Sequence, residues 1–262
     1  MDKHYAPGTW TGSHQNKNGV TLNRPPLGIR ITWAKLGENH YKPKKLSAEE
    51  KDRLNLRFCD VTVDEEVEAA VRASAQVFAD LNVHVDEISL EVLDELVEWR
   101  SGPSTTAVEA YRYHRDRLEE HLDQFDPIVS ERMLDGRDTL ATDFLQQLLI
   151  RDALRRKAHT ALENIDFLIT PTTPFAAPIL EEIDRDGVYF PTNGLCLRNT
   201  IAANLLDLCA VSLPCGFTHD GLPIGLQLIG HPYDEARLLR LARAFEQATD
   251  FHRQTPDLEA FI

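Results

Sequence analysis

Three short apolar runs in the C-terminal third of the chain constrain its fold more than any other feature. They cover about residues 166–171, 210–217 and 224–229. Short apolar runs bounded by turn residues are typical of buried strands. The segment Thr218-His219-Asp220-Gly221 joins the last two runs and carries the Asp-Gly pattern of a β-hairpin turn. The sequence therefore predicts a sheet that ends in an antiparallel hairpin.

A strand, a helix and a second strand are predicted further upstream. Residues 28–33 and 83–88 alternate between apolar and other side chains. Between them, apolar side chains recur at helical spacing over residues 67–81. The candidates for the N-cap of this helix, Thr62 and Asp64, come before them in the chain. This succession is typical of a βαβ unit with parallel strands, which places the chain in the α/β class.

Helices are predicted for most of residues 91–163, the longest from about Thr139 to Leu162. One face of that helix carries a basic cluster, namely Arg151, Arg155, Arg156 and Lys157. Such a cluster can bind an anion, but a solvated helix face is the more frequent outcome and is favoured.

Proline and glycine residues punctuate two other segments. Residues 1–26 are polar and without periodicity, so we expect a poorly ordered N-terminal tail. Residues 171–194 are predicted to form a long loop, and long ordered loops are often functional. A short helix is expected at about residues 199–206, and a final amphipathic helix after the cap candidate Asp234.

Composition excludes several classes of partner. The net charge is −14, and nucleic acid is not an expected ligand because phosphate contacts need Lys and Arg. No run approaches the roughly 20 apolar residues that span a bilayer, so no membrane association is expected. The first thirty residues lack the apolar region of a secretory signal.

Cysteine and histidine patterns indicate neither disulfides nor metal. The four cysteines, at positions 59, 196, 209 and 215, form no Cys-x-x-Cys pair, so we expect free thiols and a cytoplasmic location. The ten histidines show no convergent ligand spacing, and no phosphate-binding glycine loop occurs. We therefore expect no metal and no cofactor.

Four motifs near the C-terminus point to one family. They are the segment Asp166 to Pro174 (DFLITPTTP), Arg198-Asn199-Thr200, Ser212 to Gly216 (SLPCG) and Gly221 to Gly230 (GLPIGLQLIG). In this order and spacing they resemble the amidase-signature family. The resemblance extends more loosely over about residues 26–258.

The resemblance implies a fold and an activity. Family members have a mixed β-sheet flanked by helices on both faces, so residues 27–262 are expected to be the C-terminal portion of an amidase domain. Members hydrolyse carbon–nitrogen bonds in non-peptide amides. In the transamidase branch, they transfer the released ammonia. Their catalytic set is Ser–Ser–Lys, and its two serines lie in a Gly- and Ser-rich loop whose backbone N–H groups stabilise the oxyanion.

That catalytic loop has no counterpart in this sequence, which contains no adjacent pair of glycines and no adjacent pair of serines. No catalytic role is therefore carried onto any residue, and the chain is expected to be inactive alone. Ser212 and Cys215 lie in or near a strand predicted to be buried, without the G-x-S-x-G pattern of a nucleophile elbow. A non-catalytic remnant or binding module with the amidase fold remains an alternative.

Substrate contacts are expected at Arg198, Asn199 and Thr200, which border the family's pocket. The alternative is that Asn199 or Thr200 caps a helix while Arg198 lies at the surface. For Gln227, inside an apolar strand, a structural hydrogen bond to a neighbouring loop is favoured. In the transamidase branch, the A subunit of the glutamine-dependent aminoacyl-tRNA amidotransferase carries an acidic residue where this chain has Leu197, which favours a general amidase.

The predicted sheet has one further consequence. If the chain is part of a larger sheet, one strand edge is left unpaired, and such an edge favours self-association. The expected small-molecule partner is an amide, bound when the missing catalytic segment completes the site.

Overall fold

The computed structural model describes residues 64–100, 104–183 and 188–256, together with the backbone of three strands nearer the N-terminus. Contacts divide the chain into two compact units. The first contains Met1–Leu90 and Leu162–Ile262, and the second contains Glu91–Ala161. None of the described helices is both long and apolar enough to cross a membrane.

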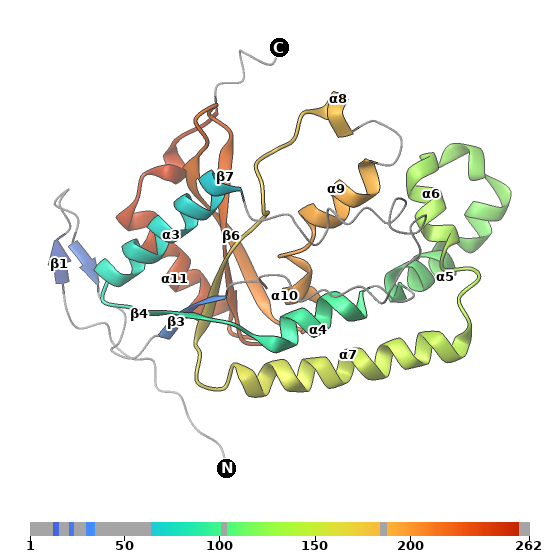
Figure 1. The fold of residues 1–262 in the computed structure, drawn as a ribbon, viewed down its shortest axis with the longest axis horizontal. Helices are drawn as coiled ribbons and strands as arrows, with labels where there is room; N and C mark the ends of the chain where they lie inside the picture. Colours follow the sequence, from blue (N-terminus) through green and yellow to red (C-terminus); the bar gives the residue numbers. More distant parts are fainter. Residues whose placement is uncertain are drawn as a thin grey trace, which may run out of the picture. The chain divides into compact units, whose positions relative to one another are not determined.

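A five-stranded mixed sheet forms the centre of the first unit (Figure 1). Its strands, in spatial order, are β4 (His84–Ile88), β3 (Arg30–Ala34), β5 (Phe167–Pro171), β7 (Pro223–Gly230) and β6 (Cys209–Phe217). β3 is parallel to β4 and β5, whereas β7 is antiparallel to β5 and β6. The predicted strands, the parallel βαβ unit and the antiparallel hairpin are therefore confirmed.

Little of the predicted N-terminal tail is described. Two short strands, β1 (Ser13–Gln15) and β2 (Thr21–Asn23), pair antiparallel within it. The remainder of residues 1–26 lies outside the described residues, as does Thr62. The disorder of this tail and the boundary at residue 27 stay predictions.

Helix α3 (Glu65–Asp80) connects the parallel strands β3 and β4. It begins at Asp64, whose carboxylate accepts a hydrogen bond from the backbone N–H of Glu66 at 2.9 Å. It ends before Asn82, which takes the left-handed conformation (φ 64°) that asparagine tolerates better than most residues. The cap candidate Asp64 is thus confirmed, and its bond supplies one of the partners that a helix start lacks.

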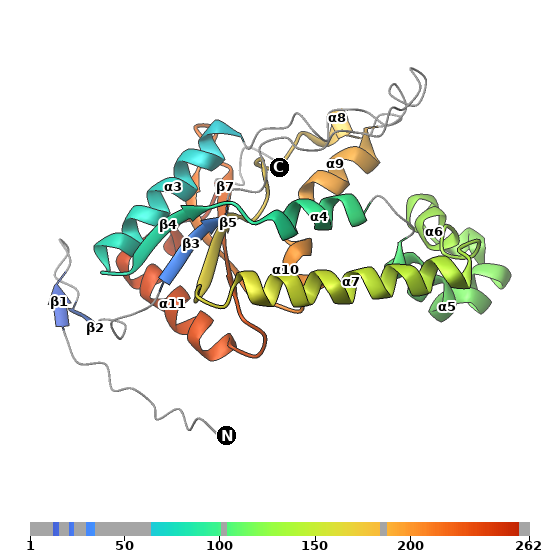
Figure 2. The same ribbon diagram turned by 60° about the horizontal axis from the view of Figure 1, so that its bottom comes forward.

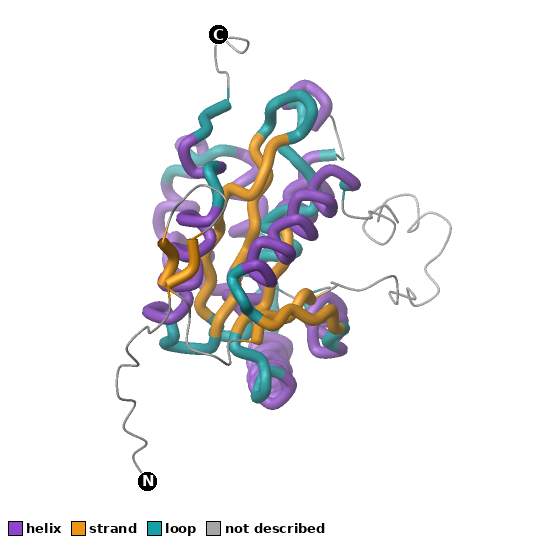
Figure 3. The backbone as a smooth tube through the Cα atoms, turned by 90° about the vertical axis from the view of Figure 1, so that its left-hand side faces the viewer, coloured by secondary structure: helices purple, strands orange, loops and turns teal. Residues whose placement is uncertain are grey.

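Helices α3 and α11 (Glu235–Ala248) cover one face of the sheet (Figure 2). Phe78 and Phe245 stack with ring centroids 5.2 Å apart, and both are almost fully buried. Phe167 and Leu228 complete the same core from the strands. Figure 3 shows helices lying beside the strands of the sheet.

The final helix begins where the sequence predicts, but its N-cap residue does not form the expected capping bond. Asp234 occupies the N-cap position without a side-chain cap bond. Its carboxylate instead accepts from Arg237 at 3.0 Å, and Arg237 also binds Asp166 at 2.5 Å. This network ties the start of α11 to the start of β5.

Three short helices follow β5 in the chain. They are α8 (Leu180–Ile183), α9 (Tyr189–Cys196) and α10 (Ile201–Leu205), and a 3₁₀ turn, η2 (Phe251–Arg253), follows α11. The loop predicted for residues 171–194 is therefore partly helical. Pro191 did not prevent α9, because it lies in the first turn, where the missing N–H costs nothing. α9 and α10 lie on the side of the sheet away from α3 and α11, so helices flank both faces (Figure 1).

The hairpin between β6 and β7 follows its turn chemistry. Gly221 has φ 83° and donates its N–H to the carbonyl of Thr218 at 2.9 Å. The backbone N–H of His219 donates to Glu66 at 2.9 Å, which joins the turn to the start of α3. β6 comes last in the strand order of the described sheet, and the unpaired edge expected to favour self-association stays a prediction.

The second unit is helical. Its elements are α4 (Glu91–Trp99), α5 (Thr105–Glu120), η1 (Leu122–Gln124), α6 (Pro127–Leu134) and α7 (Ala141–Ala161). Gly136 permits its close packing, because a Cβ there would lie 2.2 Å from the carbonyl oxygen of Ala107. The indole N–H of Trp99 donates to the carbonyl of Gln147 at 3.2 Å, which joins α4 to α7.

The basic cluster on α7 has acidic neighbours within this unit. Arg155 binds Asp152 at 2.8 Å, and Arg156 binds the same carboxylate. Lys157 binds Glu91 at 3.2 Å. These partly exposed ion pairs support the solvated face over an anion site.

Cys215 is expected to resist alkylation in the folded protein. Its side chain is 2% exposed, and burial raises the pKa of its thiol to about 11. The thiolate is the reactive form, so Cys215 should stay unmodified. Burial also raises the pKa of the thiols of Cys196 and Cys209, but these are only half-buried and should react slowly with iodoacetamide. Peptide mass spectrometry after brief native labelling, with a urea-denatured sample as control, measures this. Equal native labelling of Cys215 and Cys196 would contradict the buried position of Cys215 in β6.

Candidate functional site

A row of polar side chains crosses the sheet on the face away from α3 and α11. Side chains alternate along a strand, so Phe167 and Ile169 face the α3–α11 core and Thr170 faces the other way. The register places Thr170 and Ser212 on either side of Gln227. Thr170 and Gln227 are 1% and 3% exposed, so their polar atoms need partners inside the protein.

Gln227 finds these partners in a strand and in the segment before α10. Its side-chain amide donates to the hydroxyl of Thr170 at 2.9 Å and to the backbone carbonyl of Asn199 at 3.1 Å. The structural hydrogen bond predicted for Gln227 is therefore confirmed. The bond from Gln227 to the carbonyl of Asn199 holds residues 198–200 against the middle of the sheet.

Asn199 makes the reciprocal connection. Its side chain is 1% exposed, and its amide nitrogen donates to the backbone carbonyl of Pro171 at 2.9 Å. Its amide oxygen accepts from Nε of Arg198 at 3.2 Å. Asn199 thus links the end of β5 to Arg198, and its side chain does not act as a helix cap.

Thr200 does not cap α10 through its side chain either. It occupies the N-cap position, but its hydroxyl donates to the carbonyl of Leu197 at 3.3 Å. The capping alternative for Asn199 and Thr200 is therefore wrong. The hydroxyl of Thr200 serves the preceding turn, since its own backbone is already helical (φ −77°, ψ −28°).

Arg198 is the charged member of this group. It is half-buried, and the loss of solvent lowers the pKa of its guanidinium. A partly desolvated cation stabilises a negatively charged or strongly polar oxygen near it more than a fully hydrated cation does. Whether Arg198, Asn199 and Thr200 contact substrate stays a prediction.

Two hydroxyls beside this group were not anticipated as a pair. Oγ1 of Thr172 and Oγ of Ser212 lie 2.6 Å apart, although the residues are 40 positions apart in sequence. Ser212 is exposed, so the burial predicted for it is wrong, whereas Cys215 in the same strand is buried. The alternation of side chains along β6 explains the difference. A second hydroxyl is not a general base, so the pair does not make Ser212 an activated nucleophile.

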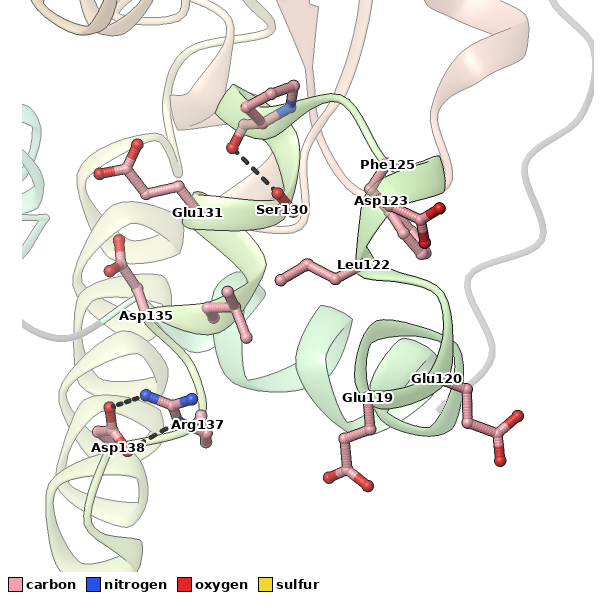
Figure 4. A pocket seen from close by; sticks show the side chains of 12 residues that line it. Glu119, Glu120, Leu122, Asp123, Phe125, Ser130, Glu131, Asp135, Arg137 and Asp138 are labelled. Carbon is pink, nitrogen blue, oxygen red and sulfur yellow. Dashed lines mark hydrogen bonds and ion pairs between the residues drawn. The ribbon is translucent and has the colours of Figure 1, made fainter.

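The second unit contains a separate hollow, shown in Figure 4. Its volume is about 950 Å³, and six of its twelve lining residues are Asp or Glu. Arg137, the single basic residue among the twelve, is bound to Asp138 at 3.0 Å. Such a lining repels anions and offers no donor array for an amide carbonyl. The polar cluster on the sheet is therefore the better candidate site.

Neither the polar cluster on the sheet nor the hollow in the second unit carries a metal-binding group within the described part of the chain. Clusters of three or more His, Cys, Asp or Glu side chains with suitable geometry are absent from the residues that the structure describes. The groups that the candidate site does present are hydrogen-bonding side chains and the charge of Arg198.

Comparisons with known proteins agree with the motifs. The family model named Amidase matches residues 37–239. The chain is 44% identical to the A subunit of glutamyl-tRNA(Gln) amidotransferase from Moorella thermoacetica over 139 residues, which are 51% of this chain and 28% of the relative. It is 34% identical to an amidase of Pseudomonas putida over 199 residues, which are 75% of this chain and 42% of the relative.

The fold has close counterparts among solved structures. Kluyveromyces lactis allophanate hydrolase superposes with a TM-score of 0.68 at 26% identity, over 86% of this chain and 33% of that protein. The chain spans less than half the length of each of these three proteins. The residues matched by the family model include all four motifs and the polar cluster around Asn199 and Gln227. The chain belongs to the amidase family.

Proposed function

We propose that this chain forms the substrate-binding side of a carbon–nitrogen hydrolase that acts on small non-peptide amides. The observation that carries the proposal is the buried Thr170–Gln227–Asn199 network beside the partly accessible Arg198, inside the region that matches the family. The proposed location is the cytoplasm. The nucleophile and the base are proposed to lie in a catalytic segment outside these 262 residues.

The three predicted site residues take different roles in this proposal. Arg198 contacts the substrate, because it is the charged and partly accessible member. Asn199 is a positioning residue, since its side chain is buried and holds Arg198 through Nε. Thr200 is half-buried and lies beside them at the start of α10.

A hydrolysis assay on the purified chain tests this proposal. The chain is incubated with a panel of aliphatic and aryl amides, and the release of ammonia or amine is measured. A serine-directed phosphonate probe is applied in parallel. We expect neither turnover nor serine labelling by the chain alone, and turnover when a family catalytic segment is supplied with it. Turnover with serine labelling by the chain alone would overturn the proposal. The variant Ser212→Ala then shows whether Ser212 is the labelled residue.

A transamidase subunit is the second candidate function. The 44% identity to the A subunit of an amidotransferase favours it. Leu197 argues against it, because an apolar side chain that is 39% exposed cannot recognise the amino group of glutamine. Glutamine belongs in the same panel, and preferential ammonia release from glutamine by the completed enzyme would favour the transamidase.

A non-catalytic binding module is the third candidate. It predicts no turnover even after a family catalytic segment has been supplied in a correctly folded complex. The same panel therefore separates it from the hydrolase, and neither interpretation assigns a cofactor to the chain.

The edge strand β6 is the proposed site of association. Residues Cys209–Phe217 lie at the end of the described strand order, and a free strand edge pairs readily with another strand. We expect concentration-dependent self-association in sedimentation velocity. Ala210→Lys should reduce it, because Ala210 is exposed and a lysine on an edge strand opposes pairing. A chain that is monomeric at every concentration would contradict this proposal.

A further inference from the structure

The hydroxyl pair of Thr172 and Ser212 is built around a glycine. The backbone N–H of Thr172 donates to the carbonyl of Gly225 at 2.8 Å, which fixes Thr172 against β7. A Cβ on Gly225 would lie 2.8 Å from Oγ1 of Thr172 and 3.1 Å from Oγ of Ser212. The two hydroxyls meet across β7 because this residue has no side chain.

The pair keeps hydrogen-bonding capacity that other hydroxyls in the protein use internally. Thr173 and Thr249 donate to backbone carbonyls within four residues of themselves. In the pair, one hydroxyl donates to the other, so one O–H and several lone pairs remain. Ser212 is exposed and Thr172 is half-buried, so a ligand can reach this O–H.

The guanidinium of Arg198 is linked to the hydroxyl pair through Asn199 and Pro171. The carbonyl of Pro171, directly before Thr172, accepts from Asn199, and Asn199 accepts from Nε of Arg198. Burial lowers the pKa of Arg198, so its charge is poorly hydrated and favours an oxygen ligand nearby. Donors and positive charge together select oxygen acceptors over ammonium groups.

We propose that Thr172 and Ser212 bind an oxygen of the substrate, either the carbonyl oxygen of an amide or the oxygen of a carboxylate on the same molecule. This inference rests on the proposed function of the site, and it adds two residues that determine substrate specificity. Arg198 acts on the same oxygen through its charge.

Binding of benzamide and benzoate to the full chain, alone and with a family catalytic segment supplied, tests the proposal without turnover. Ligand-observed NMR titration gives a dissociation constant for each probe. We expect Thr172→Val and Ser212→Ala each to weaken binding by about three- to tenfold, the value of one hydrogen bond. Thr249→Val is the matched control, because it removes a half-buried hydroxyl at the end of α11 and should leave both constants unchanged.

Two further variants sharpen the test. Gly225→Ala should weaken binding of both probes, because its Cβ displaces the pair. Arg198→Met separates the two sources of the oxygen: a larger loss for benzoate identifies a carboxylate, and equal losses identify the amide carbonyl. Thermal unfolding of each variant checks that it is folded.

Two results would overturn the inference. One is binding of neither probe in the millimolar range by the wild-type chain, both alone and with the catalytic segment supplied. The other is equal affinity of the wild-type, Thr172→Val and Ser212→Ala chains for both probes. Hydrolysis by the completed enzyme is measured separately, so a failed hydrolysis assay with intact, hydroxyl-dependent binding counts against the proposed function alone.

Discussion

Replacing Phe78 by alanine is expected to lower the free energy of unfolding by about 3–5 kcal/mol. Phe78 is 0% exposed, and its ring stacks on Phe245 between α3 and α11. The variant loses the transfer free energy of a large apolar group and leaves a cavity that the neighbouring strands cannot fill. Urea denaturation followed by circular dichroism measures the loss.

Leu239→Ala is the matched control for this prediction. Leu239 lies in α11, the helix of Phe245, but its side chain is 58% exposed. Its replacement should change the free energy of unfolding by less than about 0.5 kcal/mol. The chain contains two compact units, so the transition is fitted as a single step only if the fluorescence and circular dichroism curves coincide. A loss below about 1 kcal/mol for Phe78→Ala would contradict the packing of α3 against α11.

Replacing Asn199 by alanine is expected to cost about 2–4 kcal/mol of unfolding free energy, because it removes a hydrogen-bond partner from two polar groups at once. The carbonyl of Pro171 loses its donor, and Nε of Arg198 loses an acceptor. The carbonyl of Pro171 lies where water has little access, since Pro171 and Asn199 are both buried, whereas Arg198 is half-buried. The same variant should weaken benzoate binding if Asn199 positions Arg198, which a purely structural role elsewhere in the fold would not do.

Asn204→Ala supplies the control within the neighbouring helix. Asn204 is exposed in α10, and its loss should stay within about 0.5 kcal/mol of the wild-type stability. Similar effects of Asn199→Ala and Asn204→Ala would show that the link between β5 and Arg198 is not formed.

The candidate site was only partly predictable from sequence. The motifs identified the segment Arg198-Asn199-Thr200, but they did not separate a buried positioning residue from a partly accessible cation. The pair of Thr172 and Ser212 was missed, because each residue lies in a different motif. A signal was present in a third motif, since the missing side chain of Gly225 makes room for these two hydroxyls to meet.

The sequence by itself determined the local elements of this protein. Alternation and apolar runs specified the strands, Asp64 specified the start of α3, and Asp220-Gly221 specified the hairpin turn. These features depend on neighbours within a few residues, because caps, turns and periodicity act over one or two turns of backbone.

Only the tertiary structure decided what these elements build. It placed β7 between β5 and β6, and thereby brought Thr170, Gln227 and Ser212 into one row. It also buried Asn199 while leaving Arg198 partly accessible, and it separated residues 91–161 as a second unit. The physical reason is that strand order and register arise from burial of one complete sheet face, and a single shift in register would turn every one of these polar side chains to the other face.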